Sequence, residues 1–400
     1  MLIEFVLALI VGILVGVCTG LFPGIHINLI SAALIASLAH FQNFSPMTLV
    51  VFIVAMSITH TFLDFIPSIY LGAPDSDSFL SVLPGHQMLR NGKGHEAVAI
   101  TLIGSLISFL PTIIFTFVFI YFLPSFYSSF ISIIPYVLIF LSFYLIFREE
   151  LIGTSLVVFL LAGYLGFLSF NLPVKEPLLP LLSGLFGISS LILSLKDSPF
   201  LPEQETSLKI KSLFDKRMIK PFLAGSFIAP IFSFIPGTGS GHAATLASEF
   251  TNTRDLRGFL LLVGITNTII MTLSFVTLYA INRTRSGSAA AVKDILKTMT
   301  LQNLTTIILV AVITGFIAFF LGLAISKLAA KNISKISYKK LSIATIIILV
   351  GVNFFLTNWL GILVLITSSA LGVFAIRSNS RRINLMGALI IPTIIYYLIN

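Results

Sequence analysis

The chain has 400 residues, of which 57% are apolar and only 10% are charged, and its mean hydropathy is +1.06. A soluble globular domain carries about 25% charged residues, so this composition excludes a fold whose surface faces water. The formal net charge of +9 does not indicate a nucleic-acid partner, because the basic residues cluster in short loops between apolar runs.

Apolar runs that approach or exceed the length of a bilayer span follow one another along the chain. A transmembrane helix needs about 20 apolar residues, and examples of such runs are 98–123, 126–147, 151–169, 177–195, 301–326, 341–357 and 359–376. The sequence therefore predicts an all-α integral membrane protein with about 10–12 transmembrane segments. Breaks are expected near Ser125 and just before Trp359. The pairs 3–22 with 25–40 and 221–235 with 238–250 are each either one broken span or a re-entrant hairpin.

Two parts of the chain read alike. A Pro-Gly pair interrupts an apolar stretch at 23–24 and again at 236–237, and Ile-Thr-His-Thr at 58–61 matches Ile-Thr-Asn-Thr at 265–268. Proline and glycine break helices more abruptly than other residues do. Paired, interrupted apolar segments in two halves are typical of the substrate site of a secondary transporter.

Loop charges predict how the two halves lie in the membrane. Cytoplasmic loops collect Lys and Arg, and most of the 24 basic residues fall on one predicted side, in loops that include 197–219, 327–340 and 377–382. Counting crossings from these loops puts corresponding loops of the two halves on opposite sides. The sequence thus predicts two inverted-topology repeats with broken or re-entrant helices at midplane. The expected boundaries are residues 1–200 for the first transmembrane repeat, 201–219 for a cytoplasmic linker and 220–400 for the second repeat.

Polar residues follow each Pro-Gly break. Lipid cannot satisfy the backbone groups that a break frees, and a new helix N-terminus attracts anions. We therefore expect substrate-binding residues at and after the breaks, namely Pro23, Gly24, His26, Asn28, Pro236, Gly237, Thr238, Gly239, Ser240 and His242. The alternative is a pair of structural kinks, which are ordinary in membrane helices.

Two arginines stand beyond the second repeated segment. Arg283, Arg285 and Ser286 come after Asn267 in the chain. A guanidinium binds a carboxylate or phosphate through bidentate hydrogen bonds. These four residues complete the expected substrate site. The alternatives for the arginines are snorkelling to the interface and an Asp–Arg salt bridge that closes a gate.

Ionisable residues of the first half suggest a coupling ion. His60 and Asp64 are one helical turn apart, and ionisable residues inside a membrane are functional hypotheses by default. The expected ion-coupling residues, for Na⁺ or a proton, are Thr59, His60, Asp64, Asp75 and Asp77. The alternatives are a buried His–Asp hydrogen bond that packs the halves together and, for Asp75 and Asp77, solvated loop acids.

Catalytic signatures are missing from the sequence. It contains no GxSxG, HExxH or GxxxxGK[ST] motif, and its six histidines are scattered without metal-ligand spacing. We expect no catalytic residue, no metal site and no cofactor other than Na⁺ as a candidate coupling ion. A membrane-embedded hydrolase is the enzyme alternative.

Two segments resemble a known family. LPGHQMLRNGKGHEAVAI at 83–100 and the Pro-Gly-Thr-Gly at 236–239 are similar to the TctA family, the large membrane subunit of the tripartite tricarboxylate transporters. The matching positions of the first segment are Gly85, Met88, Arg90, Gly92, Lys93, Gly94 and Ala97. The chain departs from the family in being shorter, in having His26 and Asn28 where small residues are usual, and in its arginines at 283 and 285. A short, single-component and archaeal branch fits these departures.

The resemblance implies a function and partners. Such proteins are permeases of the cell membrane that move a small organic anion, a di- or tricarboxylate, by secondary active symport with Na⁺ or H⁺ and alternating access. The implied partners are a small membrane subunit and an extracytoplasmic binding protein, and the assembly is either a single chain or a homodimer. A translocase for a polyprenyl-phosphate-type lipid or other phosphate anion is the nearest alternative, and a channel or structural scaffold is a third.

Overall fold

The computed structural model describes residues 2–22, 27, 30–31, 34, 44–72, 78–174, 177–197, 202–208, 215–235, 238–253, 255–335 and 338–399. Within these ranges all regular structure is helical. Eight of the described helices are long and apolar enough to cross a membrane, and two shorter apolar helices cover Ile131–Phe147 and Leu178–Leu193. The prediction of an all-α integral membrane protein is confirmed. The number of spans stays a prediction.

The first half runs from α1 to α11. Its α-helices are α1 (Leu2–Leu21), α3 (Pro46–Leu63), α4 (Phe65–Leu71), α5 (Val82–Arg90), α6 (Gly94–Ile107), α7 (Phe109–Phe130), α8 (Ile134–Phe147), α9 (Ile152–Asn171), α10 (Leu178–Leu182) and α11 (Ser189–Asp197). The 3₁₀ turns η2 (Phe79–Ser81) and η3 (Ile131–Ile133) precede α5 and α8, and a π-helical turn, η4 (Ser183–Ile188), joins α10 to α11.

The second half runs from α13 to α19. Its helices are α13 (Ile219–Phe232), α14 (Ser240–Thr251), α15 (Leu256–Ile281), α16 (Gly287–Leu296), α17 (Leu301–Ile333), α18 (Tyr338–Arg377) and α19 (Gly387–Ile399), with 3₁₀ turns η5 (Lys216–Met218) and η6 (Arg382–Met386). Polar N-cap residues determine where several of these helices begin. The Asp255 carboxylate accepts a hydrogen bond from the Gly258 amide at 2.8 Å, and the Thr300 hydroxyl accepts one from the Asn303 amide at 3.2 Å. α13 and α14 have 14 and 12 residues, too few for either to span alone.

The contacts between helices are reciprocal in the two halves. α1 packs on α3 as α13 packs on α15, while α3 packs on α16 and α17 as α15 packs on α5 and α6. At the periphery α19 packs on α9, and α18 packs on η4 and α11. Such reciprocity is what a two-fold rotation relating the halves produces. Whether that axis lies in the membrane plane, and where each repeat begins and ends, stays a prediction from the loop charges and the sequence period.

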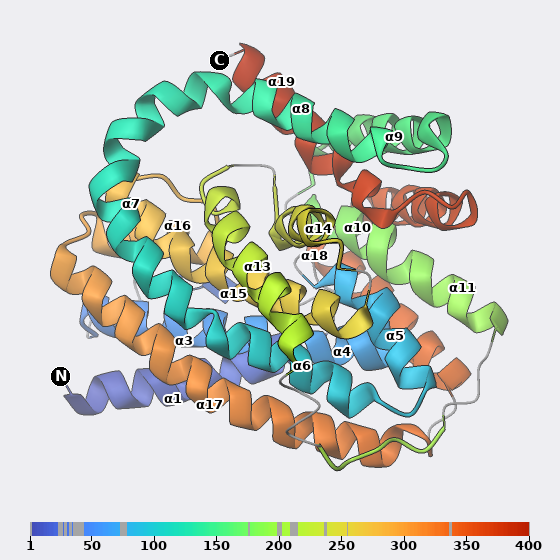
Figure 1. Cartoon of the computed structure of the whole chain (residues 1–400), viewed down its shortest axis with the longest axis horizontal. Helices are drawn as coiled ribbons and strands as arrows, with labels where there is room; N and C mark the ends of the chain where they lie inside the picture. The colour runs from blue at the N-terminus through green and yellow to red at the C-terminus, as the bar shows by residue number, and fades with distance from the viewer. Residues whose placement is uncertain are drawn as a thin grey trace.

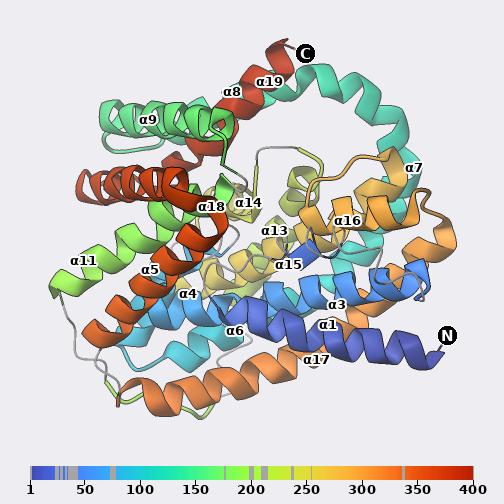
Figure 2. The same ribbon diagram turned by 180° about the vertical axis from the view of Figure 1, so that it is seen from behind.

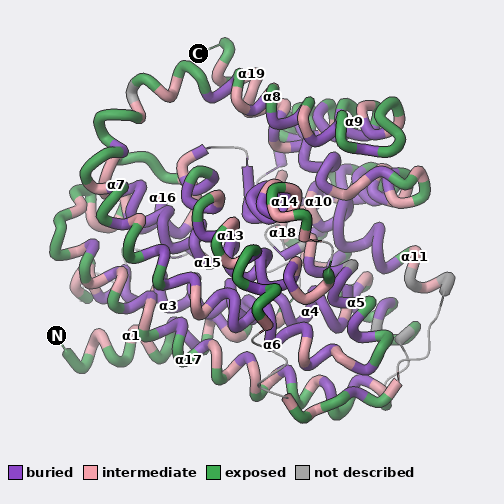
Figure 3. The backbone as a smooth tube through the Cα atoms, viewed as in Figure 1, coloured by how far each residue is buried: buried purple, intermediate pink, exposed green. Residues whose placement is uncertain are grey.

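The helices form two groups, which are visible from both sides (Figures 1 and 2). The core bundle contains α1, α3–α7 and α13–α17, and the outer bundle contains α8–α11, α18 and α19. In the core bundle α3–α4 and α15 are interior helices, because 94% of the most apolar window of each is buried, against 28–39% in the other candidate spans. Figure 3 shows this buried centre, with exposed residues concentrated on peripheral helices such as α1, α7 and α9.

The predicted helix breaks have different outcomes. The break before Trp359 is confirmed, since Asn358 within α18 has φ 58° and ψ −164° and divides it into two helical segments. The break near Ser125 is wrong, because α7 continues through Pro124 and Ser125 to Phe130, and the chain turns at η3. A proline inside a membrane helix removes a single backbone donor, which neighbouring groups can compensate.

Close packing of α6 on α15 depends on glycine. A Cβ on Gly264 would lie 2.2 Å from the carbonyl oxygen of Thr101, whereas a Cβ on Gly351 would meet nothing within 4 Å. We expect Gly264→Ala to destabilise the protein by about 1–3 kcal/mol through overpacking and Gly351→Ala to be neutral or slightly stabilising. Thermal unfolding of both variants in detergent tests this. Equal melting temperatures for the two variants would show that α6 can move away from α15 without loss of stability.

The described part of the predicted linker packs against the turn between α5 and α6. The Gln204 side chain accepts the Gly94 amide at 2.9 Å and donates to the carbonyls of Leu89 and Pro202 at 3.0 and 2.8 Å. The Glu205 amide donates to the Gly92 carbonyl at 2.8 Å. The connection between the halves is thus fixed to the segment that carries the sequence resemblance.

Candidate functional site

The two interior helices bring the repeated segments together. Nδ2 of Asn267 on α15 lies 3.3 Å from the carbonyl oxygen of Thr61 and 3.5 Å from Oδ2 of Asp64. All three residues are buried. The segments at 58–61 and 265–268, which the sequence period pairs, therefore meet inside the core bundle.

Asp64 stands where α3 ends and α4 begins. Pro67 has no N–H to donate to the carbonyl of Leu63, so the backbone ladder is interrupted beside the Asp64 carboxylate. Five residues earlier in the chain, Thr59 Oγ1 is buried and has no hydrogen-bond partner among the described residues. Carboxylate, carbonyl and hydroxyl oxygens are the ligands that hard cations take. This arrangement is compatible with a cation site.

His60 ties α3 to α1. Its Nδ1 lies 3.1 Å from Thr19 Oγ1, and that hydroxyl donates to the Gly16 carbonyl at 3.2 Å. Since the single hydroxyl proton is used there, Nδ1 of His60 carries the proton in this bond. The predicted ion-coupling residues Thr59, His60 and Asp64 therefore lie on one buried stretch, and His60 is shared with the neighbouring helix.

In the second half, His242 lies in the first turn of α14. Its Nδ1 accepts the Gly239 amide at 3.1 Å, so the neutral ring carries its proton on Nε2. The ring stacks on Phe232 with centroids 6.5 Å apart. The residue is fully buried, and Nε2 has no hydrogen-bond partner among the described residues. A buried donor is therefore available at the start of α14.

The predicted arginines differ in position. Arg285 is partly buried and donates from Nη2 to the Thr238 carbonyl, directly before α14. Arg283 is exposed at the end of α15. Ser286 caps α16 by accepting the Ala289 amide at 3.1 Å, and its hydroxyl lies 3.0 Å from that of Ser274 on α15. The structure thus brings Arg285, and not Arg283, to the start of α14.

We call Thr238, Gly239, Ser240, His242 and Arg285 the α14 site. The first-turn amides of a helix carry partial positive charge, and here a guanidinium and a buried imidazole N–H are added to them. Thr238, Gly239, Ser240 and His242 are all buried. This combination of donors in a desolvated place is suited to an anionic group such as a carboxylate.

Several predicted site residues lie outside the described residues. They are Pro23, Gly24, His26, Asn28, Asp75, Asp77, Pro236 and Gly237. One pair of described contacts matches between the halves: the Ser68 and Ser78 hydroxyls are 2.7 Å apart before α5, as those of Ser274 and Ser286 are 3.0 Å apart before α16.

The far end of α14 holds an ion network that sequence reasoning missed. Arg381 donates from Nε to Glu149 at 2.6 Å and from Nη1 to Glu249 at 2.8 Å, and Arg148 reaches Glu249 at 2.5 Å. Asn384 also donates to Glu149, at 3.0 Å. Because Glu249 lies in α14 and the other groups lie in or beside the outer bundle, the network joins the two bundles. From the sequence we interpreted Arg381 as a charge of a cytoplasmic loop. Its ion pairs with Glu149 and Glu249 could not be predicted, because these partners lie far from it in the chain.

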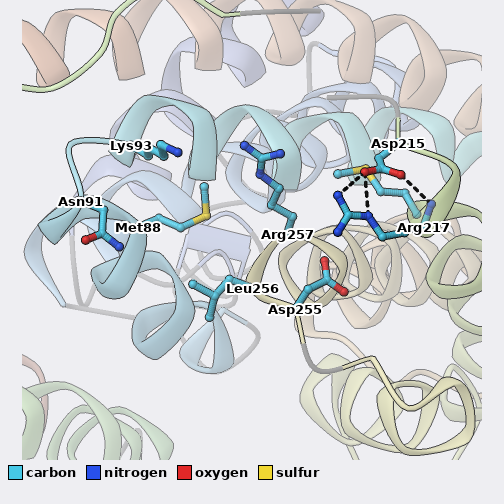
Figure 4. Close-up of a pocket in the computed structure, with 9 residues that line it drawn as sticks. Met88, Asn91, Lys93, Asp215, Arg217, Asp255, Leu256 and Arg257 are labelled. Carbon is cyan, nitrogen blue, oxygen red and sulfur yellow. Dashed lines mark hydrogen bonds and ion pairs between the residues drawn. The ribbon is translucent and has the colours of Figure 1, made fainter. Parts of the chain in front are cut away.

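A pocket of about 480 Å³ opens beside the α5–α6 turn (Figure 4). It is lined by Met88, Asn91, Lys93, Asp215, Arg217, Met218, Asp255, Leu256 and Arg257. Most of its charges are already matched: Arg217 donates twice to Asp215, Arg257 pairs with Glu96, and Asp255 caps α15. None of the predicted site residues lines it, and its compensated charge makes it less suited to an anion than the α14 site.

Comparisons with known proteins give a family match and a similar uncharacterized protein. The family model described as the tripartite tricarboxylate transporter TctA family matches residues 6–387. An uncharacterized protein of Methanocaldococcus jannaschii is 32% identical over 424 residues, covering 98% of each chain. No solved structure matches the chain.

Proposed function

Because the chain belongs to the tripartite tricarboxylate transporter TctA family, we propose that it is a secondary active transporter of a small organic anion, a di- or tricarboxylate. The observation that carries this proposal is the α14 site. There a partly buried guanidinium, helix first-turn amides and the Nε2–H of His242 are gathered in the core bundle. The family consists of transporters, which favours transport over catalysis.

The transport cycle uses the two-fold arrangement of the halves. A carrier must expose its site to each side in turn, and two reciprocal halves supply two related packings for this. The segment after the second Pro-Gly pair, from Thr238 on, provides the anion donors. The cell membrane is the location that a multi-pass chain of this family occupies.

The coupling ion, Na⁺ or a proton, binds at Asp64. The support is the buried Asp64 carboxylate beside the Leu63 carbonyl that Pro67 leaves without a donor, with Asn267 of the other half in contact. An ion there acts on both interior helices, so its binding changes the packing between the halves. A small membrane subunit and an extracytoplasmic binding protein are the partners that the name of the family suggests.

Uptake by reconstituted protein tests the function. Liposomes with the purified chain should accumulate labelled citrate or succinate when a Na⁺ or proton gradient is imposed, and protein-free liposomes should not. Inorganic phosphate is included as the competing substrate class. Accumulation of phosphate without either carboxylate would assign the protein to phosphate transport, and no uptake of any of the three would reject the proposal for the chain acting alone.

Substitution at Asp64 is expected to change ion dependence. In Asp64→Asn the carboxylate charge is lost but the shape is kept, so uptake should no longer respond to the imposed Na⁺ or proton gradient. The preference among citrate, succinate and phosphate should remain, because the α14 site is untouched. Asp294→Asn, at an exposed position on α16, is the matched control. Gradient-driven uptake by Asp64→Asn at the wild-type level would place the coupling ion elsewhere.

A further inference from the structure

Two successive arginines at the start of η6 have opposite surroundings. Arg381 donates to Glu149 and Glu249 and also reaches the Leu145 carbonyl at 3.3 Å. Arg382 is also drawn into the protein, and its Nε and Nη1 are inaccessible to solvent. Neither of these Arg382 atoms has a hydrogen-bond partner among the described residues. The guanidinium of Arg381 is thus satisfied, whereas two donors of Arg382 have no partner within the described part of the chain.

Two buried donors without a described partner on a partly buried guanidinium require an explanation. Burying a charge without a partner is strongly unfavourable, and arginine does not escape the cost by losing its proton. The carboxylates on this side of α14 do not supply the partner: Glu149 accepts from Arg381 and Asn384, and Glu249 accepts from Arg381 and Arg148. The acids of the network are already engaged.

His86 on α5 is close enough to Arg382 for the positive charge of Arg382 to act on it. Burial and the positive charges of Arg382 and then Arg90 lower the pKa of His86, on α5, to about 4. His86 is therefore neutral at physiological pH, and Arg382 and Arg90 remain as two cations acting on one place. The surroundings of Arg382 thus carry a positive charge that a bound anion would compensate.

We propose that Arg382 binds the carboxylate or phosphate group of a small anion at a second site, between η6 and α5. The two solvent-inaccessible donors, Nε–H and Nη1–H, can each donate a charge-assisted hydrogen bond to an oxygen of such a group. This site is separate from the α14 site, since Arg285 contacts the start of α14 and the Arg381 network contacts its end. A helix of 12 residues is about 18 Å long, beyond the reach of one di- or tricarboxylate.

The place of the second site in the membrane gives it a role. Loop charges predict that 86–96 and 377–382 lie on the cytoplasmic side, so Arg382 meets an anion on its way out of the α14 site toward the cytoplasm. This role, in which Arg382 binds the anion during its release to the cytoplasm, rests on the proposed function. Anion binding by Arg382 in itself does not depend on the proposed function.

Thermal unfolding of the full chain in detergent tests the binding, with citrate and inorganic phosphate as separate probes and chloride at equal ionic strength as the reference. Arg382→Met keeps an unbranched apolar stem and removes the charge, so without anion its melting temperature should rise by about 2–4 °C. Arg381→Met, the matched control, should lower it, because two carboxylates lose their partner.

Anion-dependent shifts identify the second site. In an Arg285→Ala background, citrate or phosphate should still raise the melting temperature, and adding Arg382→Met should abolish that rise. The probe that gives the larger rise distinguishes a carboxylate site from a phosphate site. Arg382→Gln serves as a second variant if Arg382→Met does not fold.

Two results would overturn the proposal. One is a fall in melting temperature for Arg382→Met like that of Arg381→Met, with the anion-dependent rise kept, which would make Arg382 structural. The other is no rise with either anion in the wild type. Because the readout is stability, an Arg382-dependent rise without liposome uptake would reject the proposed function and keep this site. Liposome uptake without an Arg382-dependent rise in melting temperature would reject this second site and keep the proposed function.

Discussion

Arg285→Ala is expected to abolish uptake of the transported anion. The guanidinium lies beside the first turn of α14 and donates to the Thr238 carbonyl, so its loss leaves an incoming carboxylate without its fixed positive partner. Removing one member of a buried charge pair costs about 3–5 kcal/mol, which corresponds to a loss of about a hundredfold or more in uptake at limiting substrate. Arg285→Lys should recover only part, because an ammonium lacks the planar fork. Initial rates in liposomes measure this.

Arg283 provides the control for this prediction. It is two residues away but exposed, so Arg283→Ala should retain most of the uptake. Equal losses in the two single variants would mean that both arginines bind the anion, as the sequence alone suggested. Wild-type uptake by the double variant would mean that the anion rests on the helix N-terminus and His242 without either guanidinium.

Arg381→Met is expected to cause the largest loss of stability. It leaves Glu149, whose side chain is 3% exposed, and Glu249 without their main partner. Because 38% of the Arg381 side chain is itself exposed, the cost should fall below that of a fully buried pair, at about 2–3 kcal/mol.

Arg217→Met is the matched control: its bond to Asp215 has the same 2.6 Å length but lies at the surface, with 78% of the arginine exposed. A surface pair contributes about 0–1 kcal/mol. Chemical or thermal unfolding distinguishes the two, and similar losses would show that the network between the bundles is dispensable.

The same network predicts a dependence on acid. Burial alone would raise the pKa of Glu249, but the hydrogen bonds and charges of Arg381 and Arg148 outweigh burial and lower it. A lowered folded-state pKa stabilises the protein above the unfolded value of about 4.3, and this stabilisation is lost as the pH falls through the folded value. Glu249→Gln should therefore reduce stability near neutral pH and flatten its fall below about pH 4.

The sequence period predicted much of the fold. α6 begins at Gly94 and α17 at Leu301, α9 at Ile152 and the second segment of α18 at Trp359, so one offset aligns helices that no local pattern would pair. Hydrophobic length predicted several of the long apolar helices, such as α9 and α17, because lipid excludes other structure. The break at Ser125 was wrong, because proline and serine in a membrane helix need not end it.

The candidate site was less predictable from sequence. Arg283 and Arg285 have the same chemistry and lie in one loop, and only the path of the chain after α15 decides which one turns toward Thr238. The roles of Arg381 and Arg382 depend on helices more than a hundred residues distant, and a charge beside an apolar run reads as a loop charge whichever way it faces. Contacts of this kind follow from the packing of whole helices and leave no local signal.

The reciprocal packing of the halves bears on the ancestry of the chain. α3 finds two of its partners, α16 and α17, in the other half, and α15 finds α5 and α6 in the first. A chain of half this length would leave its most buried helix uncovered, so it would not be a complete folding unit. If the repeat arose by duplication, its forerunner had to associate as a pair of identical chains. Fusion then joined the two copies at a ratio of one to one and allowed their sequences to diverge. One half now has acidic residues in the region where the other has Arg285.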